Sequence, residues 1–501
     1  MKWFLLALGI GLGTYASIFR LGNDRVDRVF SQFEDTPFKF PSQFFWGTAS
    51  SDQQVEGQQA SDWTAFEKRV VKEGLTDEAS GRSLLPKAGH IARLDNYSND
   101  VREKKTNYDS LAMEYLSDAK SLGTNAYRFS ISWSRLFPRE GMTKPDPDGV
   151  EYYRNIFETL KSLKMEPFVT LFHFATPEWF WNERNGKRGW EREDALELFG
   201  QFVQACLDHY GRYVSYWVTL NEPMVYLYEG YHLGYYPPLE KRKEPDEYAP
   251  VVSQLLKAHL KAYKLIKAFE KENDHETWVG IAKHSRTFEP MRRFNPLDRI
   301  SAKIAEQAFH YDFLDALATG KLHVSGSSFN ESIPDLAGSQ DYLGVNYYGR
   351  LFFQSKLNDP YNPDVYEYDP NDPTQDVDEM KHVMSPHGFY RVLTALNDKY
   401  HLPIFVLEHG IAEAAFNDTL RQKYIPAHIK EMGYAMRHGG VDVRGYFYWS
   451  LMDNFEWIHG FELKFGLMQV DFDNEFERRF RPSAEIYRKI IKDGRLLGKE
   501  E

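Results

Sequence analysis

The sequence predicts a single (β/α)8 barrel, and three observations favour this fold class. Short apolar runs alternate with longer amphipathic segments from Phe44 to Ile491, as they do in βαβ units that build a parallel sheet. There are eight such runs, the number that closes this kind of barrel. Polar or aromatic residues recur where the runs end, and a barrel gathers its carboxyl-terminal strand ends into one ring. A doubly wound open sheet is the alternative, but it would spread those residues along an edge.

Each expected strand is a short run rich in apolar, aromatic or β-branched residues. In chain order the expected strands are Phe44–Ser50, Ala126–Ser132, Pro167–His173, Tyr216–Glu222, Trp278–His284, Tyr342–Tyr348, Ile404–Glu408 and Gly445–Ser450. Apolar residues at helical spacing predict helices between them. These are Tyr108–Leu122, Tyr152–Leu163, Ala195–Tyr210, Pro250–Glu270, Leu297–Ala318, Gly388–Lys399 and Arg421–His438. No glycine-rich phosphate-binding motif follows the first strand, which argues against the nucleotide-binding folds.

The amino terminus carries a separate hydrophobic segment, residues 1–21. Its stretch from Trp3 to Phe19 has no charged residue and is close to the length that spans a membrane, about 17 to 25 residues. An uncleaved membrane anchor is the favoured interpretation, with membrane association through residues 3–19. A cleaved signal peptide, which would leave a secreted or periplasmic protein, and a soluble appendage are the alternatives. We expect residues 22–37 to be a polar tether and residues 38–501 to form the barrel domain.

Composition excludes several classes of partner and cofactor. The formal net charge of −12 argues against nucleic acid, because phosphate binding needs a basic surface. The single cysteine, Cys206, cannot form an intrachain disulfide and lies in an apolar helical pattern. No metal-ligand spacing is present, so we expect neither a metal ion nor another cofactor.

Two glutamates, Glu222 and Glu408, end the fourth and seventh expected strands. A carboxylate at a strand end is costly unless it is solvated, paired or used in chemistry. In a barrel these two would face each other across the mouth. Hydrolysis of a glycosidic bond needs such a pair: one acid protonates the leaving oxygen, and an ionised carboxylate acts on the opposite side of the anomeric carbon. The separation of the two carboxylates decides whether the anomeric configuration is retained or inverted.

Seven ordered motifs give the chain a close resemblance to the family 1 glycoside hydrolases, the retaining β-glucosidase and β-galactosidase family. The motifs are FFWGTASSDQQVEG at 44–57, NAYRFSISWSRLFP at 125–138, LFHFATPEWF at 171–180, WVTLNEP at 217–223, DYLGVNYYGR at 341–350, VLEHG at 406–410 and GVDVRGYFYWSLMDNFEW at 440–457. The resemblance covers residues 38–491, nearly everything after the hydrophobic segment. It implies a (β/α)8 barrel and cleavage of β-glycosides.

The resemblance also implies residue roles, with Glu222 as acid/base and Glu408 as nucleophile. Arg128 and Tyr348 would hold the nucleophile and lower its pKa, because a cation and a phenol donor favour the carboxylate. The acid/base would need a raised pKa. Asn221 would bind the sugar 2-hydroxyl, with Asn346 supporting the pair. The remaining positions bind the glycone sugar: Gln54, His173, Glu456 and Trp457 at its hydroxyls, and Trp449 under its ring.

Some positions depart from the family pattern, namely Asp52, Gln53, Phe174, Ala175 and His409. They leave both glutamates in place, so they question substrate choice more than reaction type. We therefore expect a retaining exo-β-glycosidase that acts on a small-molecule or glycolipid β-glucoside or β-galactoside.

Two alternatives remain for the reaction itself. An anchor followed by a barrel also resembles the plant sensitive-to-freezing enzymes, in which a galactosyl group moves between membrane glycolipids. The second alternative, a non-catalytic glycan-binding barrel, would be indicated by loss of a glutamate, and both are present.

Overall fold

A computed structural model describes residues 38–57, 59–73, 98–356 and 363–494 of the chain. Eight parallel strands form a closed ring within these ranges. The strands are β1 (Phe45–Ala49), β2 (Ala126–Ser130), β3 (Glu166–Phe172), β4 (Tyr216–Asn221), β5 (Trp278–Pro290), β8 (Leu343–Gln354), β10 (Ile404–His409) and β11 (Val443–Trp449). Closure is direct, because β1 pairs in parallel with both β2 and β11, and β8 with both β5 and β10. The predicted barrel is therefore confirmed.

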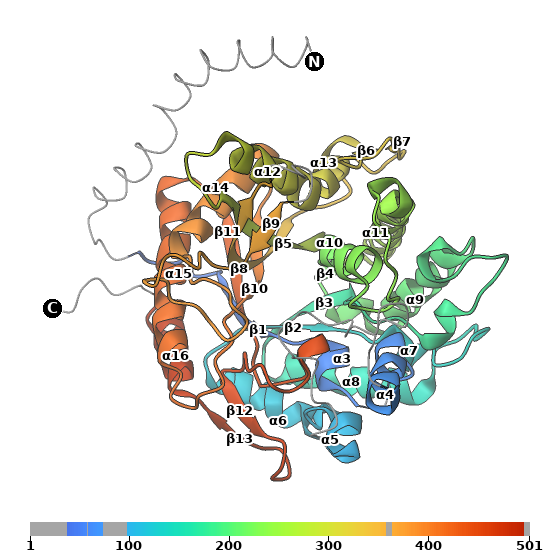
Figure 1. The fold of residues 1–501 in the computed structure, drawn as a ribbon. Coiled ribbons are helices and arrows are strands. Elements are labelled where there is room, and N and C mark those ends of the chain that lie inside the picture. The colour runs from blue at the N-terminus through green and yellow to red at the C-terminus, as the bar shows by residue number, and fades with distance from the viewer. Residues whose placement is uncertain (1–37, 58, 74–97, 357–362, 495–501) are drawn as a thin grey trace.

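Helices surround the ring of strands on the outside (Figure 1). The α-helices described are α3 (Asp52–Val55), α4 (Asp62–Glu73), α5 (Asn99–Lys104), α6 (Tyr108–Ser121), α7 (Trp133–Leu136), α8 (Pro147–Ser162), α9 (Ala195–Tyr210), α10 (Pro223–Leu227), α11 (Pro245–Asn273), α12 (Pro296–Glu306), α13 (Asp312–Thr319), α14 (Pro386–Tyr400), α15 (Thr419–His438) and α16 (Pro482–Asp493). Several begin with a proline in the first turn, where the missing N–H costs no hydrogen bond. Their buried faces cover the barrel, as the apolar spacing in the sequence predicts.

Two strands, β5 and β8, run well beyond their predicted ends. β5 and β8 continue past the barrel and pair from Thr287–Arg350 to Pro290–Phe353. Short hairpins complete the sheet structure: β9 (Asp364–Tyr366) lies antiparallel to β8, β6 (Lys321–His323) pairs with β7 (Asn330–Ser332), and β12 (Met468–Asp471) pairs with β13 (Glu477–Phe480). The predicted helix Leu297–Ala318 is divided into α12 and α13 by a π-helical turn, Gln307–Tyr311.

Aromatic rings fill one layer of the barrel interior. The ring of Phe168 stacks on Tyr216 with centroids 4.4 Å apart, and Phe45, Phe405 and Phe447 pack around them. Because these rings come from β1, β3, β4, β10 and β11, they join strands from all sides of the ring. The barrel is thus a packed core, and a substrate can approach only from an end.

The hydrophobic segment, residues 1–21, and the tether, residues 22–37, lie outside the described residues. Among the helices that the structure describes, none combines the length and the hydropathy that a membrane-spanning segment requires.

Candidate active site

Glu222 and Glu408 lie at the carboxyl-terminal ends of β4 and β10, where the sequence predicts them. Glu408 belongs to β10 itself, whereas Glu222 directly follows β4 and precedes α10. The backbone of Glu222 has φ +43° and ψ 56°, the left-handed region that non-glycine residues rarely adopt. Its N–H donates to the carbonyl of Ala282 on β5 at 2.8 Å. Strained backbone of this kind persists where the surrounding structure holds it, and it concentrates at functional sites.

Two donors hold the carboxylate of Glu408. Nη1 of Arg128, from β2, donates to Oε1 at 2.6 Å, and the hydroxyl of Tyr348, from β8, donates to Oε2 at 2.9 Å. Arg128 also donates from Nη1 to the carbonyl of Leu407 at 3.2 Å, which fixes the guanidinium against the same strand. The arginine and the glutamate are both buried. Each oxygen of Glu408 thus has a partner that stabilises the ionised form.

A continuous chain of hydrogen bonds connects the two glutamates. Nη2 of Arg128 donates to Oδ1 of Asn221 at 2.7 Å. Nδ2 of Asn346 donates to the same Oδ1 at 3.1 Å and to Oε1 of Glu222 at 2.8 Å. Asn346 is the register partner of Glu408 in the pairing of β8 with β10. These side chains therefore lie at one level of the barrel, as one site.

A second donor to Glu222 is a residue to which the sequence assigned no role. Nδ1 of His284, on β5, lies 2.9 Å from Oε1 of Glu222. Behind it, Nε of Arg286 donates to Nε2 of His284 at 2.9 Å. His284 ends a predicted strand, so the reasoning that found the glutamates could have found it. Arg286 lies beyond that predicted end and has no signal in the sequence alone.

The five glycone positions predicted besides Asn221 are also brought together beside the pair of glutamates. Nδ2 of Asn221 donates to Nε2 of His173 at 3.0 Å, and Nε2 of Gln54 donates to Oε2 of Glu456 at 3.1 Å. The rings of Trp449 and Trp457 stack near His173, with centroids 5.9 and 5.8 Å away. All five residues are buried. They line one side of the site with two aromatic rings and several polar groups.

The pKa values of the two glutamates differ from the expectation. Burial raises the pKa of Glu408 to about 7, which outweighs the Arg128 and Tyr348 contacts, and the nearby Glu222 adds to the rise. Burial alone would also raise the pKa of Glu222. His284 opposes it through its charge when protonated and its hydrogen bond, and with the Asn346 amide and the Lys283 ammonium it holds that pKa below its usual value. These two directions are opposite to the expected order of a raised acid/base and a lowered nucleophile, because burial outweighs the donors at Glu408 whereas His284, Asn346 and Lys283 outweigh burial at Glu222.

Two of the departures from the family pattern, His409 and Phe174, have different surroundings. His409 follows Glu408 on β10 but its ring stacks on Phe389, with centroids 4.8 Å apart, and its Nδ1 lies 2.7 Å from the hydroxyl of Tyr446. Successive side chains of a strand point to opposite faces, so His409 packs into the surrounding helices while Glu408 faces the barrel. Phe174, in contrast, packs on the sugar-site ring of Trp457, with centroids 5.1 Å apart.

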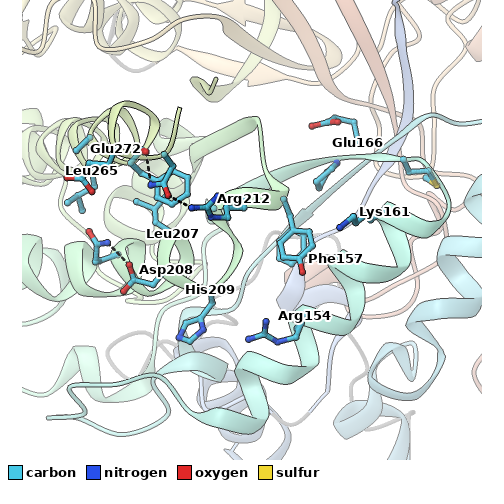
Figure 2. Close-up of a pocket in the computed structure, with 18 of the residues that line it drawn as sticks. Arg154, Phe157, Lys161, Glu166, Leu207, Asp208, His209, Arg212, Leu265 and Glu272 are labelled. Carbon is cyan, nitrogen blue, oxygen red and sulfur yellow. Dashed lines mark hydrogen bonds between the residues drawn. The ribbon is translucent and has the colours of Figure 1, made fainter. Parts of the chain in front are cut away.

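Figure 2 shows a groove whose lining includes several charged side chains. It has a volume of about 1210 Å³ and lies among α8, α9 and α11. Its lining includes Glu166, the first residue of β3, together with Arg154, Asp208 and Arg212. Strand starts face the opposite end of a barrel from the strand ends that carry Glu222 and Glu408. Among the described residues, no group of three or more histidine, cysteine, aspartate or glutamate side chains could hold a metal ion.

A barrel with a buried carboxylate pair and aromatic rings at its strand ends defines the class of sugar-cleaving (β/α)8 enzymes. The chain belongs to glycosyl hydrolase family 1, whose family model matches residues 36–495. It is therefore a β-glycosidase.

Relatives from distant organisms agree with this assignment. "Beta-glucosidase 16" of Arabidopsis thaliana is 31% identical over 90% of this chain and 91% of that protein. "1,4-beta-D-glucan glucohydrolase" of Thermotoga neapolitana is 28% identical over 91% of this chain and 99% of that protein. Among solved structures, "beta-glycosidase from Pyrococcus horikoshii" superposes with a TM-score of 0.77 at 33% identity and covers 92% of this chain and 97% of that one.

Proposed function

We propose that this β-glycosidase is a retaining exo-enzyme that hydrolyses β-glucosides or β-galactosides through a covalent glycosyl-enzyme. The observation that carries the proposal is the chain of hydrogen bonds that runs from Glu408 through Arg128, Asn221 and Asn346 to Glu222. It supplies a nucleophile held by a cation and an acid/base held by neutral donors. Several relatives carry the name β-glucosidase, which supports a β-glucoside as substrate.

In the first step Glu408 attacks the anomeric carbon. A bond forms between that carbon and a carboxylate oxygen of Glu408, and the bond to the aglycone oxygen breaks. Both hydrogen-bond donors to Glu222 contact Oε1, and no described residue donates to Oε2. Oε2 is therefore the oxygen that can take up a proton and pass it to the leaving oxygen. In the second step Glu222 takes a proton from water, which attacks the anomeric carbon and releases Glu408.

The sugar is recognised by the buried group around His173. The ring of Trp449 offers an apolar face for the sugar ring, while Gln54 and Glu456 offer polar groups for hydroxyls. Burial raises the pKa of Glu456 to about 8, with a further contribution from Glu408. Glu456 is thus protonated at neutral pH and can both donate and accept a hydrogen bond. The amide of Asn221 lies beside the nucleophile's Arg128, where it can contact the 2-hydroxyl.

Glu222 and Glu408 share one proton over the middle of the pH range. The reactive arrangement has that proton on Glu222 and a negative charge on Glu408. With Glu222 below its usual pKa and Glu408 at about 7, the singly protonated pair dominates from below about pH 4.5 to about pH 7. We expect kcat/KM to follow a bell with its alkaline limb near pH 7. A plateau that continues to pH 9 would contradict these protonation states.

Azide rescue tests the assignment of Glu408. Glu408→Gly should reduce hydrolysis of an aryl β-glucoside by at least about 1000-fold, because the nucleophile is absent. Added azide should restore turnover and yield the α-glycosyl azide, which NMR identifies. Wild-type activity in the variant, or a β-configured azide product, would overturn the proposal. Sugar binding without turnover in the wild type would instead indicate the non-catalytic barrel.

Transfer to another glycolipid, in place of hydrolysis, is the second candidate and shares the first step. The observation that favours it is the uncharged stretch from Trp3 to Phe19, which would place the enzyme at a membrane. Incubation of the full chain with a galactolipid separates the two: oligogalactolipid indicates transfer, and free galactose alone indicates hydrolysis.

A further inference from the structure

His284 lies between Glu222 and Arg286, and its hydrogen bonds define its protonation. A guanidinium has only donors, so Nε2 of His284 must accept the 2.9 Å bond from Nε of Arg286. The ring proton of a neutral histidine then lies on Nδ1. Nδ1 is 2.9 Å from Oε1 of Glu222, so His284 is a donor to that carboxyl group.

Arg286 is itself held in place. Its side chain is buried, Nη1 forms an ion pair with the carboxylate of Glu367, and Nη2 lies 2.9 Å from Nε2 of His382. The guanidinium of Arg286 therefore lies within hydrogen-bond distance of the Nε2 atoms of both His284 and His382. The bond from Arg286 therefore opposes a second proton on Nε2 of His284.

The remaining surroundings of His284 offer one negative partner. Its ring stacks on Tyr348, with centroids 5.6 Å apart, and meets the edge of Phe309 at 5.9 Å. Nζ of Lys283 donates to the carbonyl of His284 at 2.9 Å. The titratable or charged groups that face the histidine are Glu222, Lys283, Arg286, His310, Tyr348 and His382. Glu222 is the acidic one among them.

We propose that His284, held as the Nδ1–H donor by Arg286, is a positioning residue that sets how much of the shared proton Glu222 carries. This inference rests on the proposed acid/base role of Glu222. A donor to Oε1 stabilises the carboxylate form of Glu222. It therefore reduces the fraction of enzyme ready to protonate a leaving group, and it keeps Glu222 ready to take a proton from water.

The protonation of His284 agrees with this role. Burial lowers the pKa of His284, Glu222 opposes that shift, and Arg286 and Lys283 add to it. A pKa below 6.5 keeps the imidazole neutral at neutral pH. The hydrogen bond to Glu222 is thus a neutral donor on a carboxylate.

Two variants distinguish the effect of the Nδ1–H donor of His284 from the effect of its aromatic ring. His284→Phe keeps an aromatic ring but removes the donor, so the pKa of Glu222 rises. Because Glu408 still holds the higher pKa, we expect the acidic limb of kcat/KM to move up by about one pH unit and the alkaline limb to stay. His284→Asn restores an N–H donor and should return the acidic limb close to that of the wild type. If both variants lower kcat/KM without moving either limb, the histidine is merely structural and the proposal fails.

Arg286→Met tests whether Arg286 fixes the Nδ1–H tautomer of His284. Without the guanidinium, His284 can take up a second proton and pair with Glu222 as an imidazolium. That extra proton removes the reactive form at low pH, so the acidic limb should also move up. An unchanged limb in Arg286→Met would show that Arg286 does not govern His284.

Glu222→Gln tests the acid/base role on its own. The double variant with His284→Phe then tests whether His284 acts through Glu222. An aryl glycoside with a strongly acidic phenol needs no proton donor, so Glu222→Gln should keep most of its kcat/KM on that substrate and lose it on a poor leaving group. If it does not, the acid/base assignment itself is wrong. If it does, adding His284→Phe should change nothing further. A further loss in the double variant would mean that His284 contacts the sugar directly, which would overturn a role through Glu222.

Discussion

Two adjacent tyrosines on β8 show how much the direction of a single side chain decides. Tyr348 donates to Oε2 of Glu408 at 2.9 Å, whereas the hydroxyl of Tyr347 donates to the carbonyl of Ser385 at 2.8 Å. Successive residues of a strand point to opposite faces, so one phenol serves the site and the other supports the surrounding helices. The pair offers a matched comparison within a single strand.

We expect Tyr348→Phe to reduce kcat/KM by about 10- to 100-fold, because a donor that stabilises the ionised nucleophile is lost. Loss of a donor to the carboxylate raises the pKa of Glu408 above about 7, so the alkaline limb of kcat/KM should move to higher pH. Tyr347→Phe removes a hydroxyl of the same strand and should lower stability by about 1 kcal/mol without moving that limb. If the alkaline limb of kcat/KM lies at the same pH in both variants, Tyr348 does not hold the nucleophile.

At the scale of the elements, strand positions followed from the sequence more reliably than strand lengths. All eight barrel strands occur where apolar runs predict them, and the polar residues at their ends form one site. The extension of β5 and β8 past the barrel was not predicted, because Ser285 to Pro290 mixes polar, charged and apolar residues without a clear period. Arg286 lies in that extension. The sequence therefore did not predict the group that contacts His284 and, through it, Glu222.

The pKa order of the glutamates could not be predicted for a related reason. The sequence identifies the donors to Glu408, Arg128 and Tyr348, from strand ends and from the family resemblance. The order depends also on how deeply both carboxyls are buried and on Lys283 and His284, which only the folded barrel places near Glu222. Burial and neighbouring charges of this kind arise from tertiary packing.

Strand β1 closes the barrel through a glycine. A Cβ on Gly47 would lie 2.4 Å from the ring of Phe447 on β11 and 2.9 Å from the carbonyl oxygen of Ala126 on β2. Gly47→Ala should therefore lower the free energy of unfolding by about 1 to 3 kcal/mol through overpacking, measured by urea denaturation. Ser117→Ala, at an exposed position of α6, should change it by less than about 0.5 kcal/mol. A Gly47→Ala protein as stable as the wild type would show that the two neighbouring strands can move apart.

At the scale of the whole molecule, the first and last described segments of the chain meet beside β1. The barrel begins with a small aromatic cluster: Phe40 packs on Phe44 and Trp46 with centroids 5.0 and 4.9 Å apart, and its N–H donates to the carbonyl of Gly494 at 3.1 Å. This contact joins the first and last described segments of the chain. We therefore propose Phe38 as the start of the catalytic domain.

A chain that begins at Phe38 should fold and keep kcat/KM on a soluble aryl β-glucoside within about twofold of the full chain, because it retains Phe40 and the whole barrel. A chain that begins at Ser42 loses Phe40, which is 4% exposed, and should unfold at lower urea, with a loss of about 3 kcal/mol. Denaturation curves and kcat/KM for the two proteins decide the boundary. If the longer chain is inactive although it folds, residues 1–37 contribute to the reaction. If the shorter chain is equally stable, the barrel begins after Phe40.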